Sequence, residues 1–141
     1  MKTQKTKDLE KLLAQHFNSR NDFYVFECTL GWYGSEIVDC VMYNCQREIY
    51  CYEIKQSVQD FHSKNKLSFF GNKNYFVMPY SLYEKVKNEI PYGIGVYVAI
   101  DGMKKLYCIK SSTKVDLKAD KEVILSSMLR SMQRDRLLNF D

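Results

Sequence analysis

Three runs of residues suited to β-strands follow one another in the first half of the chain. They are rich in aromatic, β-branched and cysteine residues and span residues 23–30, 36–43 and 48–55. Runs of this kind, separated by short polar segments, predict consecutive strands. Leucine and phenylalanine recur at helical spacing over residues 8–17, so the sequence predicts an amphipathic helix before the strands.

After the third run, helices and strands alternate. Ser57 followed by Asp60 forms a capping box, which predicts a helix that begins there and ends by Gly71. A strand is expected at 74–78, and a second capping box at Ser81–Glu84 predicts a helix that ends at Pro91. Residues 94–100 and 105–110 are expected to form a hairpin. The last expected element is a helix at 119–138, whose apolar stripe consists of Val123, Leu125, Met128, Leu129 and Met132. This order predicts one α/β domain over residues 1–141, with a mixed sheet flanked by helices.

Composition supports a single folded domain. The chain has 141 residues, of which 45% are hydrophobic and 27% charged, a balance that argues against intrinsic disorder. No stretch approaches the ~20 apolar residues of a membrane span, so we expect no membrane partner. The basic start of the chain has no apolar run behind it, so it does not resemble a secretory signal.

The five cysteines also bear on the compartment. Their number is odd, there is no Cys-x-x-Cys, and four of them lie in apolar, strand-like runs. This pattern is typical of buried free thiols, and it favours the reducing cytoplasm. Neither His16 nor His62 lies at ligand spacing from a cysteine pair, which argues against a zinc site.

Two acids and a lysine stand in runs where charges are not expected. Asp39 lies within Ile37–Val41, and Glu53 follows Tyr50–Tyr52, with Lys55 two residues on. Aspartate is poorly suited to the interior of a strand, and a carboxylate in such surroundings is costly unless it has a partner. Because strand side chains alternate between faces, Glu53 and Lys55 are expected to point to the same side.

The length of one loop decides whether Asp39 joins them. A three-residue loop, Cys45–Arg47, places Asp39 directly across from Glu53, whereas a two-residue loop would turn Asp39 to the other face. Directly opposed carboxylates repel, and a divalent cation between them would remove the repulsion. Hard oxygen ligands suit Mg²⁺, and Lys55 beside it would stabilise charge on a phosphate. In the alternative interpretation, Asp39 faces solvent at a sheet edge and Glu53 pairs weakly with Lys55.

The order of elements and the residues around Glu53 resemble a known nuclease superfamily. The core of the PD-(D/E)XK nucleases has a similar order of elements. In this chain the order is a helix, a strand, a strand with Asp39, a strand with Glu53–Lys55, a helix and a strand. The run Glu53–Phe61 is similar to the Glu-x-Lys-x-Ser-x-x-Asp-Phe run of a bacterial branch related to the MmcB-type DNA repair proteins, in which a later lysine matches Lys66. The resemblance covers about residues 7–100. Val38 precedes Asp39 where the superfamily name implies proline, and Lys64 stands where the branch has an acid.

This resemblance implies a restriction-endonuclease-like core and a Mg²⁺- or Mn²⁺-dependent nuclease, acting on DNA in repair or in a phage or mobile element. It implies Asp39 and Glu53 as metal ligands, Lys55 as the catalytic lysine, and Glu10 of the first helix as a further ligand. Small nucleases of this type often form homodimers, although no interface is legible in the sequence. Lys64, Lys66 and Lys73 follow the expected site and are candidates for neutralising a nucleic-acid backbone.

Other residues have simpler explanations. Ser57 and Asp60 are accounted for by capping, and His16 by the apolar face of the first helix. Trp32 and Tyr33, at a loop between glycines, are suited either to stacking on a base or to core packing. Glu27 has no supporting pattern, and Glu36 lies an odd number of residues from Asp39, so we expect it to face away.

Two other functional hypotheses stay open. One is a catalytically degenerate nuclease-fold module that binds nucleic acid or a protein through Lys64, Lys66 and the lysines of residues 102–118. The other is a structural domain in which the charges pair at the surface. An intact set of Asp39, Glu53 and Lys55 argues for catalysis, because a binding module does not need all three.

Overall fold

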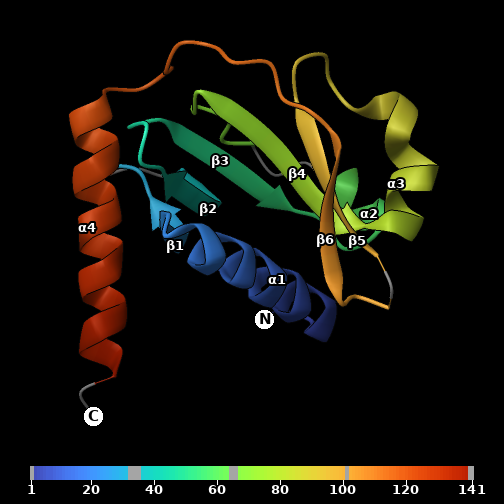
Figure 1. Cartoon of the computed structure of the whole chain (residues 1–141), viewed down its shortest axis with the longest axis horizontal. Coiled ribbons are helices and arrows are strands. Elements are labelled where there is room, and N and C mark those ends of the chain that lie inside the picture. The colour runs from blue at the N-terminus through green and yellow to red at the C-terminus, as the bar shows by residue number, and fades with distance from the viewer. Residues whose placement is uncertain (1, 32–35, 64–66, 101, 140–141) are drawn as a thin grey trace.

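The computed structural model describes residues 2–31, 36–63, 67–100 and 102–139. Its elements, in chain order, are α1 (Gln4–Arg20), β1 (Phe23–Thr29), β2 (Ile37–Tyr43), β3 (Ile49–Ile54), α2 (Val58–Phe61), β4 (Lys73–Pro79), α3 (Tyr80–Val86), the 3₁₀ turn η1 (Lys87–Glu89), β5 (Gly95–Ile100), β6 (Lys105–Lys110) and α4 (Lys121–Leu138). The predicted order of helices and strands is confirmed, and the fold is α/β (Figure 1).

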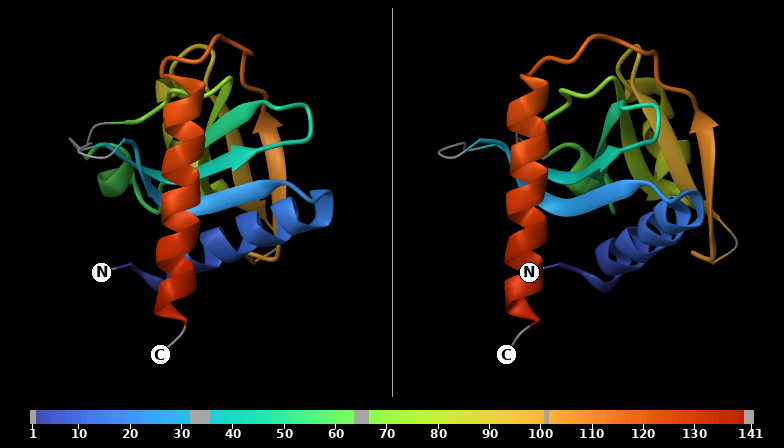
Figure 2. Two further views of the ribbon diagram at one scale, coloured as in Figure 1. Left: turned by 90° about the vertical axis from the view of Figure 1, so that its left-hand side faces the viewer. Right: turned by 60° about the vertical axis from the view of Figure 1, so that its left-hand side comes forward.

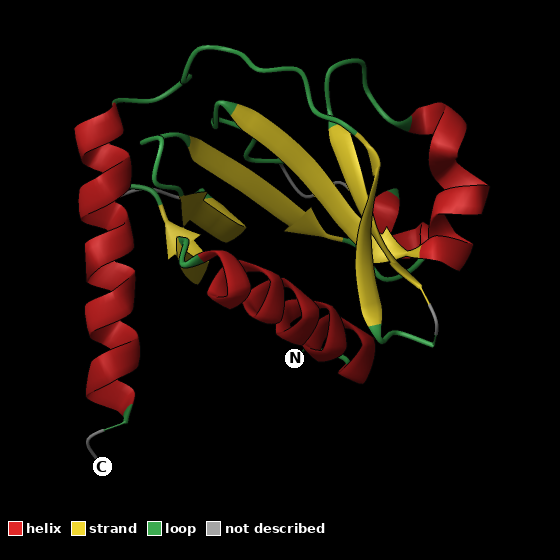
Figure 3. Cartoon of the chain, in the orientation of Figure 1, coloured by secondary structure: helices red, strands yellow, loops and turns green. Residues whose placement is uncertain are grey.

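The strands form one mixed sheet of six, in the order of the sequence. β1, β2 and β3 are antiparallel neighbours, β3, β4 and β5 are parallel, and β5 and β6 close the sheet as an antiparallel hairpin. Each parallel step requires a crossover, and the segments that contain α2 and α3 provide the two crossovers. The sheet therefore places the end of β3 beside the start of α2 (Figure 3).

Helices cover both faces of the sheet. α1 buries Leu9, Leu13 and Phe17 on one face, against a set that includes Tyr52 and Val77. On the opposite face, α4 packs over the β1 end of the sheet and α3 packs over β4 and β5. Figure 2 shows α4 alongside β1, with the C-terminal end of the helix extending past the sheet. The core thus has two layers, one on each face of the sheet, which agrees with the predicted sheet flanked by helices.

Two predicted capping boxes behave differently. The Ser57 hydroxyl accepts a hydrogen bond from the Asp60 amide at 3.1 Å, so Ser57 caps α2 as expected. Ser81 does not cap α3, which begins at Tyr80 directly after β4, with Pro79 at the N-cap position and no side-chain cap bond. Proline lacks the N–H that a continuing strand would use, so the strand ends there and the helix starts immediately.

The helix predicted to begin at Ser57 is present, but α2 ends after a single turn at Phe61, so the expected role of Gly71 as its C-terminal residue is wrong. Gly71 has a different role from helix termination. A β-carbon at this position would lie 2.8 Å from the Ile49 carbonyl oxygen and 2.9 Å from that of Lys73. The absence of a side chain therefore lets the chain pass close to β3 before β4 begins.

The predicted apolar stripe of the C-terminal helix is also partly wrong. α4 buries Ile124 and Met128, together with Ser127 and Ser131, while Leu129 is 66% exposed. The small serines let the helix approach the sheet, and the Ser127 hydroxyl accepts a hydrogen bond from the Gly31 amide at 2.8 Å. Because α4 contacts mainly one strand, its buried face is narrower than the sequence pattern suggests.

All five cysteines are free, as expected, and the side chain of Cys45 is exposed. His16 lies against the rings of Phe17 and Tyr97, and partial burial lowers the pKa of its imidazole. The interpretation of His16 as a packing residue is therefore consistent with its surroundings.

Gly71→Ala should destabilise the protein, because the new methyl group would meet two backbone carbonyls that cannot move independently. We expect the free energy of unfolding to fall by about 1–3 kcal/mol, measured by urea denaturation. Gly102→Asn is the matched control, since a β-carbon there meets nothing within 4 Å and asparagine tolerates the left-handed backbone of Gly102. Equal unfolding midpoints for Gly71→Ala and wild type would contradict this account.

Candidate active site

The site begins where β2 and β3 separate. Their backbone pairing runs from Tyr43–Ile49 to Cys40–Tyr52, which confirms the register predicted from a three-residue loop. Beyond this point β2 continues along β1, whereas β3 continues along β4. The two strands therefore fork at the next pair of residues, Asp39 and Glu53.

Asp39 occupies the inner angle of the fork. Its Oδ2 atom accepts a hydrogen bond from the Ile54 amide at 2.8 Å, in place of a backbone carbonyl of the departing strand. The same carboxyl group acts electrostatically on that of Glu53, and both residues line one pocket. The predicted meeting of Asp39 and Glu53 is thus present in the structure.

Glu53 is almost fully enclosed, with 5% of its surface exposed. Its Oε1 atom accepts a hydrogen bond from the Ser68 amide at 3.4 Å. Burial, and then the charge and hydrogen bond of Asp39, raise the pKa of the Glu53 carboxyl to about 9, against the lowering effect of Ser68 and Lys55. The Glu53 carboxyl therefore favours its protonated form at neutral pH.

Lys55 is buried to the same extent, with 5% of its surface exposed. Its amide extends the β3–β4 ladder by donating to the Val77 carbonyl at 2.9 Å, and its Nζ atom donates to the Asp60 carbonyl at 3.3 Å. Asp60 in turn accepts a hydrogen bond from the Gln56 amide through its carboxylate, at 3.0 Å. The short helix α2 therefore fixes the lysine beside the two acids.

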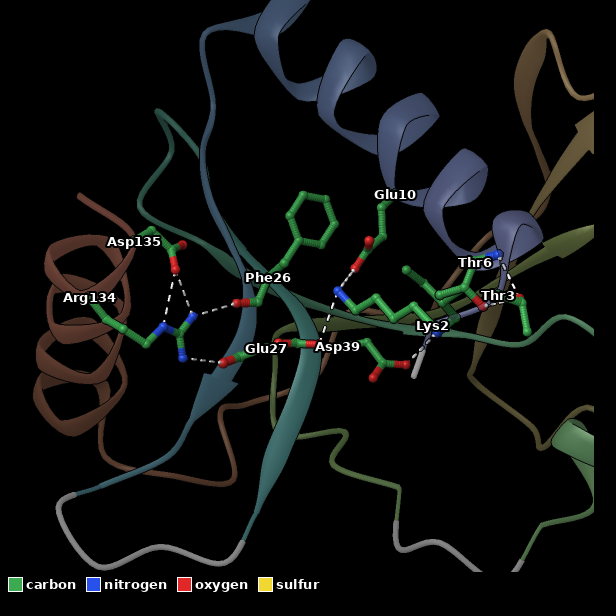
Figure 4. A network of polar contacts seen from close by, with 10 residues as sticks. Lys2, Thr3, Thr6, Glu10, Phe26, Glu27, Asp39, Arg134 and Asp135 are labelled. Atoms are coloured by element: carbon green, nitrogen blue, oxygen red, sulfur yellow. Dashed lines mark hydrogen bonds and ion pairs between the residues drawn. The ribbon is translucent and has the colours of Figure 1, made fainter. Parts of the chain in front are cut away.

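These residues line one pocket of about 550 Å³ between the start of α1 and the fork. Glu10, carried over from the superfamily as a further ligand, lies in this pocket. Its Oε2 atom is 2.5 Å from the ammonium group of Lys2, which also lies 3.0 Å from the Glu27 carboxylate (Figure 4). The structure therefore brings Glu10 to the site, but with a lysine between it and Glu27.

Sequence reasoning did not assign three charged residues of the lining to the site, which are Lys2, Glu27 and Glu36. Glu36 is expected to face away from Asp39 because strand side chains alternate between faces. That rule does not apply to Glu36, which precedes the first residue of β2. Glu27 adopts a left-handed backbone with φ of 53°, which is uncommon for residues other than glycine, asparagine and aspartate. Nothing in the sequence pattern marks Lys2 as a partner of these acids.

The lysines proposed for nucleic-acid contact divide into two groups. Lys73 opens β4 opposite Tyr50, so it lies at the other end of the strand from Glu53 and does not line the pocket. Its ammonium group instead lies 5.5 Å from the centre of the Tyr50 ring. Lys64, Lys66, Trp32 and Tyr33 lie outside the described residues.

The donor chemistry of the acid pair suits a hard divalent cation. Two carboxylates with water completing the shell are a usual arrangement for Mg²⁺. Among the described residues, no three histidine, cysteine, aspartate or glutamate side chains are already arranged to hold a metal ion. Asp39 and Glu53 are the pair whose carboxylates could hold a cation, while Glu10 is engaged by Lys2.

Comparisons with known proteins show the fold. No family model and no curated protein matches the chain. A solved structure of a protein of unknown function from Silicibacter pomeroyi is similar over 100% of this chain and 94% of that one, with a TM-score of 0.78 and 15% sequence identity. In the described part of the chain, no helix is both long and apolar enough to cross a membrane.

The raised pKa of Glu53 predicts a pH dependence of stability. Between the ordinary glutamate value of 4.5 and the folded value of about 9, the folded state holds a proton that the unfolded state has lost. The contribution of Glu53 to the free energy of unfolding is therefore fully present below pH 4.5, and it is lost as pH rises toward 9. We expect urea unfolding between pH 5 and 9 to show a shallower decline for Glu53→Gln than for wild type. Glu84→Gln, at an exposed residue of α3, is the control; equal slopes for Glu53→Gln and wild type would refute the shift.

Proposed function

We propose that this chain is a metal-dependent nuclease of the PD-(D/E)XK type, which hydrolyses phosphodiester bonds in nucleic acid, most directly DNA, with Mg²⁺ or Mn²⁺. The observation that carries the proposal is the fork at which the Asp39 and Glu53 carboxyl groups meet, with Lys55 in the same pocket. Glu53 and Lys55 are buried and Asp39 is partly buried beside them. Burial of charged groups is costly to folding, and such costs are concentrated at functional sites.

Asp39 and Glu53 would hold the metal ion. One oxygen of Asp39 is already committed to the Ile54 amide, which fixes the orientation of its carboxylate before a cation arrives. A cation between the two acids would favour the ionised form of Glu53. When bound, the ion supplies charge stabilisation at a phosphoryl oxygen and a water of lowered pKa.

Lys55 would act on the phosphate. Hydrolysis adds the hydroxyl of water to phosphorus, breaks the bond from phosphorus to the leaving oxygen, and returns a proton to that oxygen. Negative charge builds on the phosphoryl oxygens during this step, and a fixed ammonium group beside them stabilises it. An ammonium group has three hydrogens, and the Asp60 carbonyl takes one, so Lys55 retains donors for a phosphate.

The net charge of the whole chain suits a polyanionic substrate. The chain carries a net charge of +4, and Lys64 and Lys66 directly precede Leu67 and Ser68, which line the pocket. We assign these two lysines to backbone phosphates. Free cysteines suit a reducing compartment, so we place the activity in the cytoplasm.

The metal site can be tested without any substrate. We expect calorimetric titration with Mn²⁺ to show binding to the wild type, and a loss of at least about tenfold in affinity for Asp39→Asn and for Glu53→Gln, because each removes a carboxylate ligand. Asp39→Asn keeps a carbonyl oxygen that can accept from the Ile54 amide, so the fork should stay folded. Glu84→Gln should bind as the wild type does. Unchanged affinity in an Asp39→Asn, Glu53→Gln double variant would exclude this metal site.

The chemistry is tested with supercoiled plasmid and Mn²⁺. Lys55→Met should lower the rate of strand cleavage by about 10²–10³-fold while leaving Mn²⁺ affinity within about threefold of wild type, since it removes only the group that stabilises the phosphate. Lys85→Met, an exposed lysine of α3, is the matched control. Cleavage that survives Lys55→Met would move the active site elsewhere. Wild-type protein that binds Mn²⁺ and retards DNA in a gel without cutting DNA or RNA would instead support the degenerate binding module.

A further inference from the structure

We propose that Lys2 inhibits the metal site, because its ammonium group takes the position of a cation between Glu10 and Glu27. Lys2 and Thr3, which precede α1, are called the N-terminal arm. In this proposal, which rests on the proposed function, a divalent ion gains these carboxylates only when Lys2 withdraws. The arm is then an internal competitor that sets the metal concentration at which the enzyme becomes loaded.

The contacts of Lys2 are those of a bound cation. Its Nζ atom lies 2.5 Å from Glu10 Oε2 and 3.0 Å from Glu27 Oε1. Glu10 comes from α1 and Glu27 from β1, so the ammonium group joins two elements of the fold. Figure 4 shows the Lys2 side chain extended between the two acids, with Asp39 nearby.

The charge of the pocket explains why a cation is held there. The described lining residues include the acids Glu10, Glu27, Glu36, Asp39, Glu53 and Asp60, and the lysines Lys2 and Lys55. Lys55 is tied to the Asp60 carbonyl, near the acid pair. Lys2 is thus the cation at the Glu10 side, and its removal would leave the Glu10 and Glu27 carboxylates facing each other.

Glu27 is held in place from outside the pocket. Its backbone is left-handed, and the guanidinium group of Arg134 in α4 donates hydrogen bonds to the carbonyls of Phe26 and Glu27 at 3.3 Å each. A conformation of this kind persists only where neighbouring structure enforces it. The backbone of Glu27 is therefore held by α4, independently of Lys2.

The arm is built so that Lys2 can leave while the helix stays. Thr3 caps α1 by accepting a hydrogen bond from the Thr6 amide at 3.2 Å, and the Thr3 hydroxyl also bonds to the Gln56 side chain. These contacts fix the chain at Thr3, next to the segment that follows Lys55. Lys2 lies before this anchor, and rotation of its side chain alone would free the two carboxylates.

The experiment is calorimetric titration of the full chain with Mn²⁺, comparing wild type with Lys2→Met, Lys2→Arg and Lys5→Met. Lys2→Met keeps an apolar stem without the charge, and we expect it to bind Mn²⁺ about three- to tenfold more tightly. Lys2→Arg restores a cation and should return the affinity toward that of wild type. Lys5→Met removes an exposed lysine from the first turn of α1 and should bind as wild type does.

Thermal unfolding is the second measurement, and it shows whether the Lys2 substitution alters the stability of the fold. In EDTA, the thermal unfolding midpoint of Lys2→Met should lie below that of Lys5→Met, because the Glu10 and Glu27 carboxylates repel each other without the lysine. Addition of Mn²⁺ should raise the midpoint of Lys2→Met more than it raises that of Lys5→Met. Equal Mn²⁺ affinity for Lys2→Met and wild type, with binding lost in Asp39→Asn, would overturn the role of Lys2 while the metal site stands. Failure of every variant to bind Mn²⁺ would overturn the proposed function itself, and the role of Lys2 with it.

Discussion

The site depends on the hydrogen bond from the Ile54 amide to the Asp39 carboxylate. When β2 leaves β3 to follow β1, a backbone amide of β3 loses its strand partner, and an unsatisfied buried amide costs about 1–3 kcal/mol. The Asp39 side chain replaces that partner and so makes the fork stable. The acid that opens the pocket is thus the same acid that is proposed to bind the metal.

The register that brings Asp39 to Glu53 was predictable because it depends on a local turn. Asn44 fixes that turn, since its Oδ1 atom accepts hydrogen bonds from the amides of Gln46 at 3.0 Å and Glu48 at 2.9 Å. Arg47 closes the loop with a left-handed backbone. Residues near one another in the sequence thus set the pairing of β2 with β3, and with it the position of Lys55.

The other side of the pocket was beyond sequence reasoning because it depends on contacts between distant segments. Lys2 reaches Glu27 across 25 positions of sequence, and Gly71 ends no helix because its neighbours are backbone atoms of β3 and β4. Alternation also assumes regular strands. It therefore fails at Glu36, which lies outside β2, and at Glu27, where the backbone is irregular.

The irregularity at Glu27 links the C-terminal helix to the pocket. In a regular strand, Val25 and Cys28 would face opposite sides of the sheet, yet both are buried in the cluster that contains Ile124 and Met128 of α4. The left-handed residue between them shifts the alternation, so that Cys28 packs under α4 while the Glu27 side chain reaches Lys2. Burial of Cys28 offsets the backbone cost of Glu27. The packing of α4 therefore helps to determine where one acid of the candidate site lies, although α4 contributes no residue to the lining of that pocket.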